Sequence, residues 1–126
     1  MTGFSGKWKR PHGGELDAYP EYAERRRQQI AVDTAVSNFT PPMATGAVTY
    51  ADTDANEVEL STFAAALNTV DGRFTDAFMT APSPGIVAAA MKNAHYPDDD
   101  AYLDALAEAL RVEYEAAHRH GYLLQI

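Results

Sequence analysis

The sequence of 126 residues contains no cysteine. The chain by itself therefore has no disulfide bonds, no thiolate metal ligands and no cysteine nucleophile. Its apolar runs stay well short of the roughly 18 residues that a membrane-spanning helix needs. The segment Met1–Ser5 has no hydrophobic stretch of the secretory kind. We therefore expect a cytoplasmic protein that has no membrane partner.

Positive charge is also scarce: 10 Lys and Arg residues stand against 18 Asp and Glu residues, giving a net charge of −8. Binding to nucleic acid needs concentrated positive charge, so no nucleic-acid partner is expected. The basic run Arg25–Arg27 would point in several directions on a helix and is interpreted as a solvated face. Hydrophobic residues make up 46% of the chain, which indicates a folded domain with a modest core.

Residues 1–40 are predicted to form an N-terminal arm and one helix. Glycine and proline recur in residues 1–20, as is typical of a loop or an extended arm. A helix over residues 21–32 begins just after Pro20. The pair Pro41-Pro42 then prevents a helix and marks the start of the main part of the chain, residues 41–126.

The main part alternates between strand and helix patterns. The long helix of residues 98–120 is the best defined: acidic residues begin it, Gly121 ends it, and one apolar stripe runs along it, made of Leu103, Leu106, Leu110, Tyr114 and Ala117. The other expected elements are strands 47–50, 74–79 and 122–126 and helices 57–69 and 86–93, with a loop over 52–56. This order predicts an α/β fold with about three parallel strands and flanking helices, as in part of a (β/α)₈ barrel.

The last expected strand, residues 122–126, is followed by no loop. In parallel α/β folds the loops after the strands carry the chemistry. The sequence is therefore interpreted as the front part of a larger enzyme domain, ending before its reactive residues.

Three segments resemble the catalytic barrel of the cobalamin-independent methionine synthase family, in particular its shorter homologues. They are residues 41–50, the run Ala-Phe-Met-Thr-Ala-Pro-Ser-Pro-Gly of 77–85, and the helix and strand that close on Gly-Tyr-Leu-Leu-Gln-Ile of 121–126. In that family a long helix ends in glycine and a strand of this type leads into Asp-x-Pro. The resemblance covers residues 41–126 and, more weakly, the arm before them.

The resemblance implies a (β/α)₈ barrel that moves a methyl or alkyl group to a thiol, such as homocysteine, held on zinc. A folate is a candidate methyl donor, and the small-molecule substrate would be bound by the full-length protein. The family's zinc ligands are His, Cys, Glu and Cys, which lie beyond the Asp-x-Pro strand. The chain is therefore expected to hold no metal ligand and no catalytic residue, and to be inactive alone.

Four residues are candidates for substrate binding: Tyr50, Thr80, Ser83 and His12. Thr80 and Ser83 lie at the end of an expected strand and could hydrogen-bond an anionic group, although the N-cap of a helix in a rigid turn is the favoured interpretation of Ser83. Tyr50 ends an earlier strand and either lines the pocket or packs as an aromatic. His12 lies among glycines in a loop.

The other histidines are interpreted in structural terms. His118 and His120 are two residues apart on a helix, so they point to different sides and do not suit one metal ion. They are interpreted as cations that favour the end of a helix. His95 is interpreted as a solvated loop residue.

Other readings of the chain remain open. It could be a non-catalytic α/β module that binds a partner through an exposed sheet edge, or one half of a split enzyme. A small independent enzyme using Ser83 and a histidine would need a base in hydrogen-bond reach. Because open strand edges invite pairing, we expect self-association or a complementing chain.

Overall fold

In the computed structural model, residues 1–8, 17–32, 41–70, 72 and 74–126 are described. They form a mixed α/β structure whose elements, in chain order, are β1 (Thr2–Ser5), α2 (Pro20–Val32), β2 (Met43–Thr49), α3 (Thr53–Leu67), β3 (Phe78–Thr80), α4 (Pro84–Ala90), α5 (Asp99–Arg119) and β4 (Leu123–Gln125).

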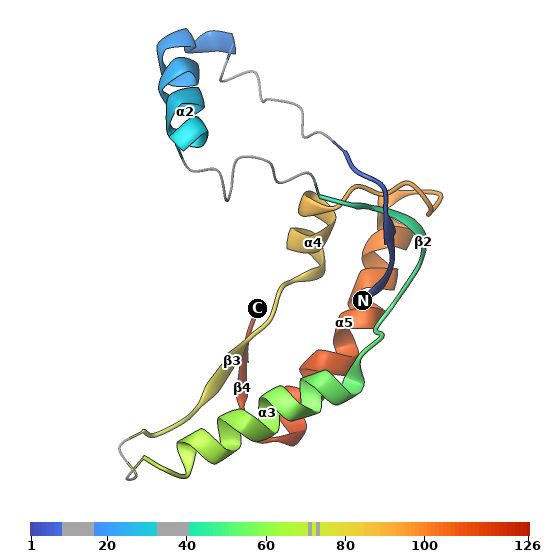
Figure 1. Ribbon diagram of the computed structural model, residues 1–126. Coiled ribbons are helices and arrows are strands. Elements are labelled where there is room, and N and C mark those ends of the chain that lie inside the picture. The colour runs from blue at the N-terminus through green and yellow to red at the C-terminus, as the bar shows by residue number, and fades with distance from the viewer. Residues whose placement is uncertain (9–16, 33–40, 71, 73) are drawn as a thin grey trace.

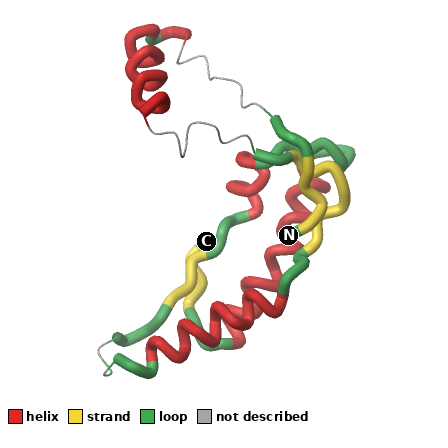
Figure 2. The backbone as a smooth tube through the Cα atoms, in the orientation of Figure 1, coloured by secondary structure: helices red, strands yellow, loops and turns green. Residues whose placement is uncertain are grey.

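The long helix α5 organises the other elements (Figure 1). The strands β1 and β2 lie along its first half, together with α4, and α3 crosses its second half beside β3 and β4. The helix α2 stands apart from these elements, as the tube in Figure 2 also shows. Within the described residues, no helix combines the length and the apolar character that a bilayer crossing requires.

The strands form two separate pairs. β3 and β4 are parallel, with Phe78 opposite Leu123 and Thr80 opposite Gln125. β1 and β2 are antiparallel, with Thr2 opposite Thr49. The prediction of three parallel strands in one sheet is therefore correct for β3 and β4 and wrong for β2. The partner of β2 comes from the N-terminal arm, which was expected to be a loop or an extended segment and not a strand of a sheet.

Glycine makes the β1–β2 contact feasible. Gly3 has φ of +89°, and a Cβ atom there would collide with the carbonyl oxygen of Ala47. Both the left-handed backbone and the close approach therefore require a residue without a side chain. The pairing register also shifts between Thr2 and Phe4, as in a β-bulge.

The predicted elements of the main part are present, with corrected ends. α3 begins at Thr53 rather than Glu57, because the carboxylate of Asp52 accepts a hydrogen bond from the Ala55 N–H at 2.9 Å and so caps the helix. The expected loop over 52–56 is thus mostly helix. β3 spans three residues, Phe78–Thr80, rather than 74–79. Gly121, with its positive φ, ends α5 as predicted, and at the other end the predicted acidic start includes Asp98, whose side chain caps the helix.

Two clusters of buried side chains each include residues of α5. The first joins β2, α4 and the first half of α5, and the second joins α3, the end of α5 and Tyr122. Of the predicted apolar stripe, Leu106, Leu110 and Ala117 are buried, whereas Leu103 and Tyr114 are only half-buried. Tyr102, outside the predicted stripe, is 1% exposed.

Candidate functional site

A small cleft of about 30 Å³ lies where α3, α5, β3 and β4 come together. The helices contribute polar side chains to it and the strands contribute their C-terminal ends. Its lining residues are Asn56, Glu59, Leu60, Met79, Thr80, Ala81, Glu113, Ala117 and Leu124. The cleft therefore adjoins the end of a parallel strand pair, where α/β folds bind their ligands.

The negative charges of two glutamates, Glu59 on α3 and Glu113 on α5, repel each other at this cleft. Glu113 of α5 is half-buried. Burial raises the pKa of its carboxyl group, and the negative charge of Glu59 raises it further, while the α-amino group of Met1 acts in the opposite direction. Glu113 is therefore more easily protonated than an exposed glutamate.

Tyr50 lies close to the same two carboxylates. Burial raises the pKa of its phenol, and the charges of Glu113, Glu59 and Asp52 add to that effect. Tyr50 follows β2 directly and is half-buried. The structure thus brings this predicted residue near the charged side of the cleft.

Asn56 is the buried polar residue of the cleft. Asn56 is 8% exposed and lines the cleft. No fully enclosed side-chain polar atom in the described part of the chain lacks a hydrogen-bond partner. The amide of Asn56 is therefore not left enclosed and unpaired by the fold.

The other predicted binding residues have different surroundings. The Ser83 hydroxyl accepts a hydrogen bond from the Ile86 N–H at 3.2 Å and caps α4, as its structural interpretation predicted. Thr80 lies at the end of β3 and lines the cleft. His12 lies outside the described residues. The structure therefore groups Tyr50 and Thr80 near one cleft and gives Ser83 a capping role.

The sequence interpretation missed the polar residues of the two helices, Asn56, Glu59 and Glu113. Asn56 and Glu59 are three residues apart, a spacing that places them on one side of a helix. Part of this signal was obscured because residues 52–56 were expected to be a loop. The approach of Glu113 depends on how α3 crosses α5, which no local pattern predicts.

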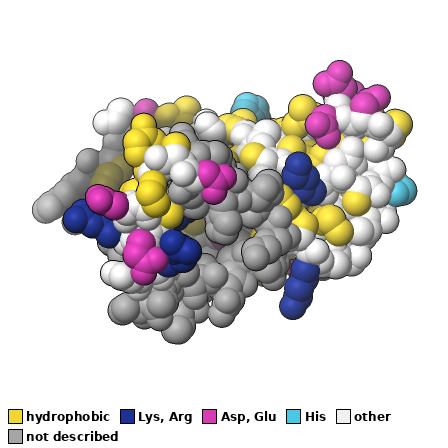
Figure 3. Space-filling view, turned by 90° about the horizontal axis from the view of Figure 1, so that it is seen from above, with side chains coloured by type: hydrophobic (Ala, Val, Ile, Leu, Met, Phe, Trp, Pro, Cys, Tyr) yellow, Lys and Arg dark blue, Asp and Glu magenta, His cyan; other side chains and the backbone are white. Residues whose placement is uncertain are grey.

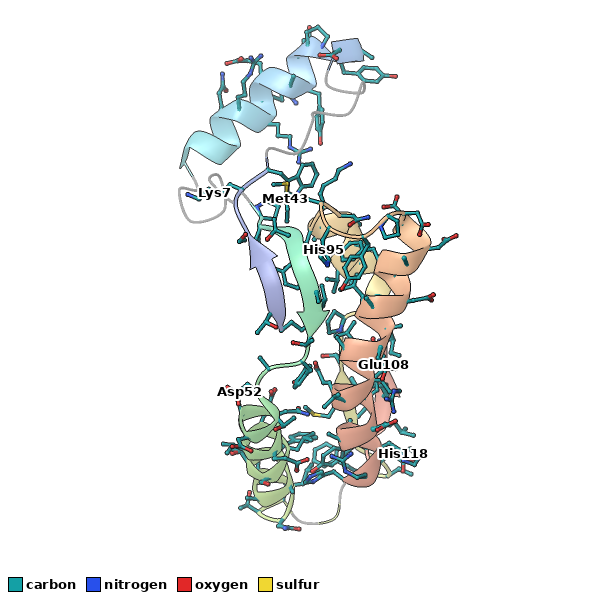
Figure 4. The ribbon with its side chains drawn as sticks, turned by 90° about the vertical axis from the view of Figure 1, so that its right-hand side faces the viewer. Lys7, Met43, Asp52, His95, Glu108 and His118 are labelled. Atoms are coloured by element: carbon teal, nitrogen blue, oxygen red, sulfur yellow. The ribbon has the colours of Figure 1, made fainter. Side chains whose placement is uncertain are left out.

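The histidines lie away from this cleft. The Nε2 atom of His120 is 2.9 Å from one carboxylate oxygen of Glu57, and Arg119 reaches the other at 3.0 Å. His118 is exposed and lies near the end of α5 on the side away from α3, while His95 lies at the opposite end, before α5 begins (Figure 4). His118 and His120 do not converge on one point, as their spacing predicted.

The described residues do not fit the zinc site that the family resemblance implies. The chain has no cysteine. In addition, no three His, Asp or Glu side chains of the described residues come close enough to hold a metal ion. No step of thiol activation on zinc can therefore be assigned to these residues.

Surface charge does not single out another site on the face seen in Figure 3. Its visible Lys and Arg side chains lie at separate places rather than in one continuous surface. Comparisons with models of protein families, with curated proteins and with solved structures found no match.

Proposed function

We propose that the chain forms part of the wall of a methionine-synthase-like (β/α)₈ barrel that moves a methyl or alkyl group to a thiol such as homocysteine. The β3–β4 pair carries the proposal. Its two strands are parallel and in register, and the connection between them contains α4 and α5. A strand, a helical crossover and a parallel strand are the repeating unit of such barrels.

The surface of this pair supports the proposal. Phe78 and Leu123 lie opposite each other and are 57% and 59% exposed. Met79 and Leu124 pack on the opposite side, against the core cluster that contains Leu60. Strands of a parallel barrel are normally apolar and covered on both faces. We infer that further strands, from residues outside this chain, cover Phe78 and Leu123.

In this proposal the chain supplies a substrate-facing rim and not the reacting groups. Thr80 ends β3, whereas Ser83 and Tyr50 follow β3 and β2. In this proposal these three residues would face the thiol substrate or its folate donor. The zinc ligands come from residues outside these 126, because the chain has no cysteine. The chain alone is then inactive and requires a complementing chain or segment.

A second candidate function is a non-catalytic α/β interaction module. It is favoured by the same exposed residues, Phe78 and Leu123, and by the open edges of the described strand pair. A module of this kind would bind a second copy or a partner strand, with no methyl transfer after assembly.

Assembly with a barrel segment tests the first candidate. The chain is mixed with the part of a cobalamin-independent methionine synthase that begins at the Asp-x-Pro strand and carries the zinc ligands. Size-exclusion chromatography with light scattering should show a one-to-one complex that contains zinc. Phe78→Asp should weaken the complex, whereas Val58→Asp, which changes an exposed valine on α3, should not.

The chain alone gives the corresponding control. It should self-associate at micromolar concentration, because its exposed strand residues are uncovered. A monodisperse monomer that unfolds cooperatively and forms no complex with the added segment would contradict the proposed barrel. Self-association without complex formation would favour the interaction module.

A further inference from the structure

We propose that α2 docks on α5 of a second copy of this chain, and that two such contacts close a symmetric dimer. Arg25 and Arg26 of α2 form the basic side of each contact. Asp100 and Asp104 of α5 form its acidic side. The contact uses no residue of the β3–β4 pair, so it goes beyond the proposed barrel and does not rest on it.

The helix α2 lacks a packing partner among the described residues of its own chain. It stands apart from the other elements (Figure 1), and of residues 20–28 only Ala23 is half-buried while the rest are exposed. The ion pair of Arg27 with Glu24, at 3.2 Å, lies within the helix itself. An isolated helix of about 12–15 residues is only marginally stable in water, because most helical stability comes from packing. The 13 residues of α2 therefore need a surface on which to dock.

One side of α2 carries residue types that are common at the centre of protein interfaces. Tyr19 and Tyr22 are 65% and 54% exposed, and with Arg25 they line an open hollow of about 450 Å³. Arg25 and Arg26 follow Tyr22 at three and four residues, the spacing of neighbours on one side of a helix. Neither arginine forms an ion pair with a described carboxylate. Tyrosine and arginine are enriched among residues that contribute most to binding, so this side of α2 has the composition of an interface.

The exposed side of α5 offers the opposite charge. Asp100 and Asp104 are both exposed and are four residues apart, so they are neighbours on the helix surface. Like charges at this spacing destabilise a helix. The helix dipole favours Asp100 in the first turn, but Asp104 lies beyond that turn. No described Lys or Arg pairs with either carboxylate, so cations from another chain stabilise this part of α5.

Charge complementarity identifies the partner as a second copy. The chain has a net charge of −8, and its only run of three consecutive arginines lies on α2. Each copy therefore carries one basic helix that stands apart and one acidic helix surface without cations. Two copies can exchange these contacts reciprocally, which is the arrangement of a symmetric dimer.

Light scattering after size-exclusion chromatography tests the dimer. The full chain carries Phe78→Asp, so that association through the exposed β3–β4 pair is removed, and it should form a dimer at micromolar concentration. Arg25→Glu combined with Arg26→Glu should raise the dissociation constant of the dimer at least about tenfold, because like charges that face each other across an interface are unfavourable. Asp100→Arg combined with Asp104→Arg should do the same. Circular dichroism checks that each variant is folded.

Mixing the two charge-reversed chains gives the sharper measurement. Each chain complements the other at both contacts, so the mixture should form a one-to-one dimer although neither chain dimerises alone. Docking of α2 on α5 of its own chain would not produce this rescue. The control chain carries Asp54→Arg and Asp76→Arg, the same change of net charge at exposed carboxylates outside α5. It should dimerise by itself and should not form the one-to-one dimer with the chain that is reversed in α2.

Three results would overturn the proposal. They are a Phe78→Asp chain that stays monomeric, a dimer whose dissociation constant does not change on charge reversal in α2 or α5, and two folded, charge-reversed chains that remain monomeric when mixed. The first result, found together with self-association of the unmodified chain, would leave the proposed barrel intact, because that association then belongs to the β3–β4 pair.

Discussion

The hydroxyl of Tyr114 donates a hydrogen bond of 2.6 Å to the carbonyl oxygen of Pro82. This bond connects the second half of α5 to the turn between β3 and α4, the turn that contains Ser83. The long helix thus positions the turn that follows a parallel strand. In parallel α/β folds such turns form the binding edge.

Removing this bond should loosen the turn. We expect Tyr114→Phe to lower the free energy of unfolding by about 0.5–1.5 kcal/mol, the usual net value of one hydrogen bond. Urea unfolding, followed by circular dichroism, measures this change in the free energy of unfolding. Tyr19→Phe, at a position 65% exposed, is the matched control and should be neutral. Equal stability of Tyr114→Phe and the unmodified chain would show that the bond does not hold the turn.

The apolar stripe of α5 should contribute most to stability where it is fully enclosed. Leu106 and Leu110 are 0% and 1% exposed, so Leu106→Ala or Leu110→Ala should cost about 2–5 kcal/mol. Leu103→Ala should cost less, because Leu103 is only half-buried. Chemical unfolding of the three variants checks this order. A loss below about 1 kcal/mol for Leu106→Ala would mean that α5 is docked loosely.

The contact of Glu57 with the end of α5 should make stability depend on pH. Hydrogen bonds from His120 and Arg119 lower the pKa of Glu57 from its ordinary value of 4.5. The folded chain therefore binds this proton less readily than the unfolded chain does. The resulting stabilisation is present above about pH 4.5 and is lost as pH falls through the lowered pKa.

Glu57→Gln isolates this contribution. Unfolding temperatures of the variant and the unmodified chain are compared between neutral pH and pH 3. The variant should be less stable at neutral pH, and the difference should shrink in acid. A difference that stays constant over this range would show that the pairing of Glu57 does not cause it. Glu24→Gln, on α2, is the control for the loss of a surface charge.

The sequence predicted those features that depend on local patterns. The ends of α5 follow from Asp98 and Gly121, and most of its buried face follows from leucines at helical spacing. The parallel pairing of Phe78–Thr80 with Leu123–Gln125 follows from a helical crossover between two apolar runs.

Features that depend on distant contacts were not predictable in the same way. β1 pairs with β2, with Thr2 opposite Thr49. Residues 1–20, which include β1, are rich in glycine and proline and show no strand pattern. The cleft required Glu59 and Glu113 to meet across two helices. The capping role of Ser83 was among the predicted alternatives, because serine before proline commonly starts a helix.

Methyl transfer by the assembled barrel tests the central claim most directly. The chain, the complementing zinc-bearing segment and their mixture are each incubated with homocysteine and a methyl-labelled folate, and labelled methionine is measured. The account predicts no product from the chain alone, product from the mixture, and loss of that product with Phe78→Asp. A folded, zinc-containing one-to-one complex that forms no methionine, or methionine formed by the chain alone, would contradict it.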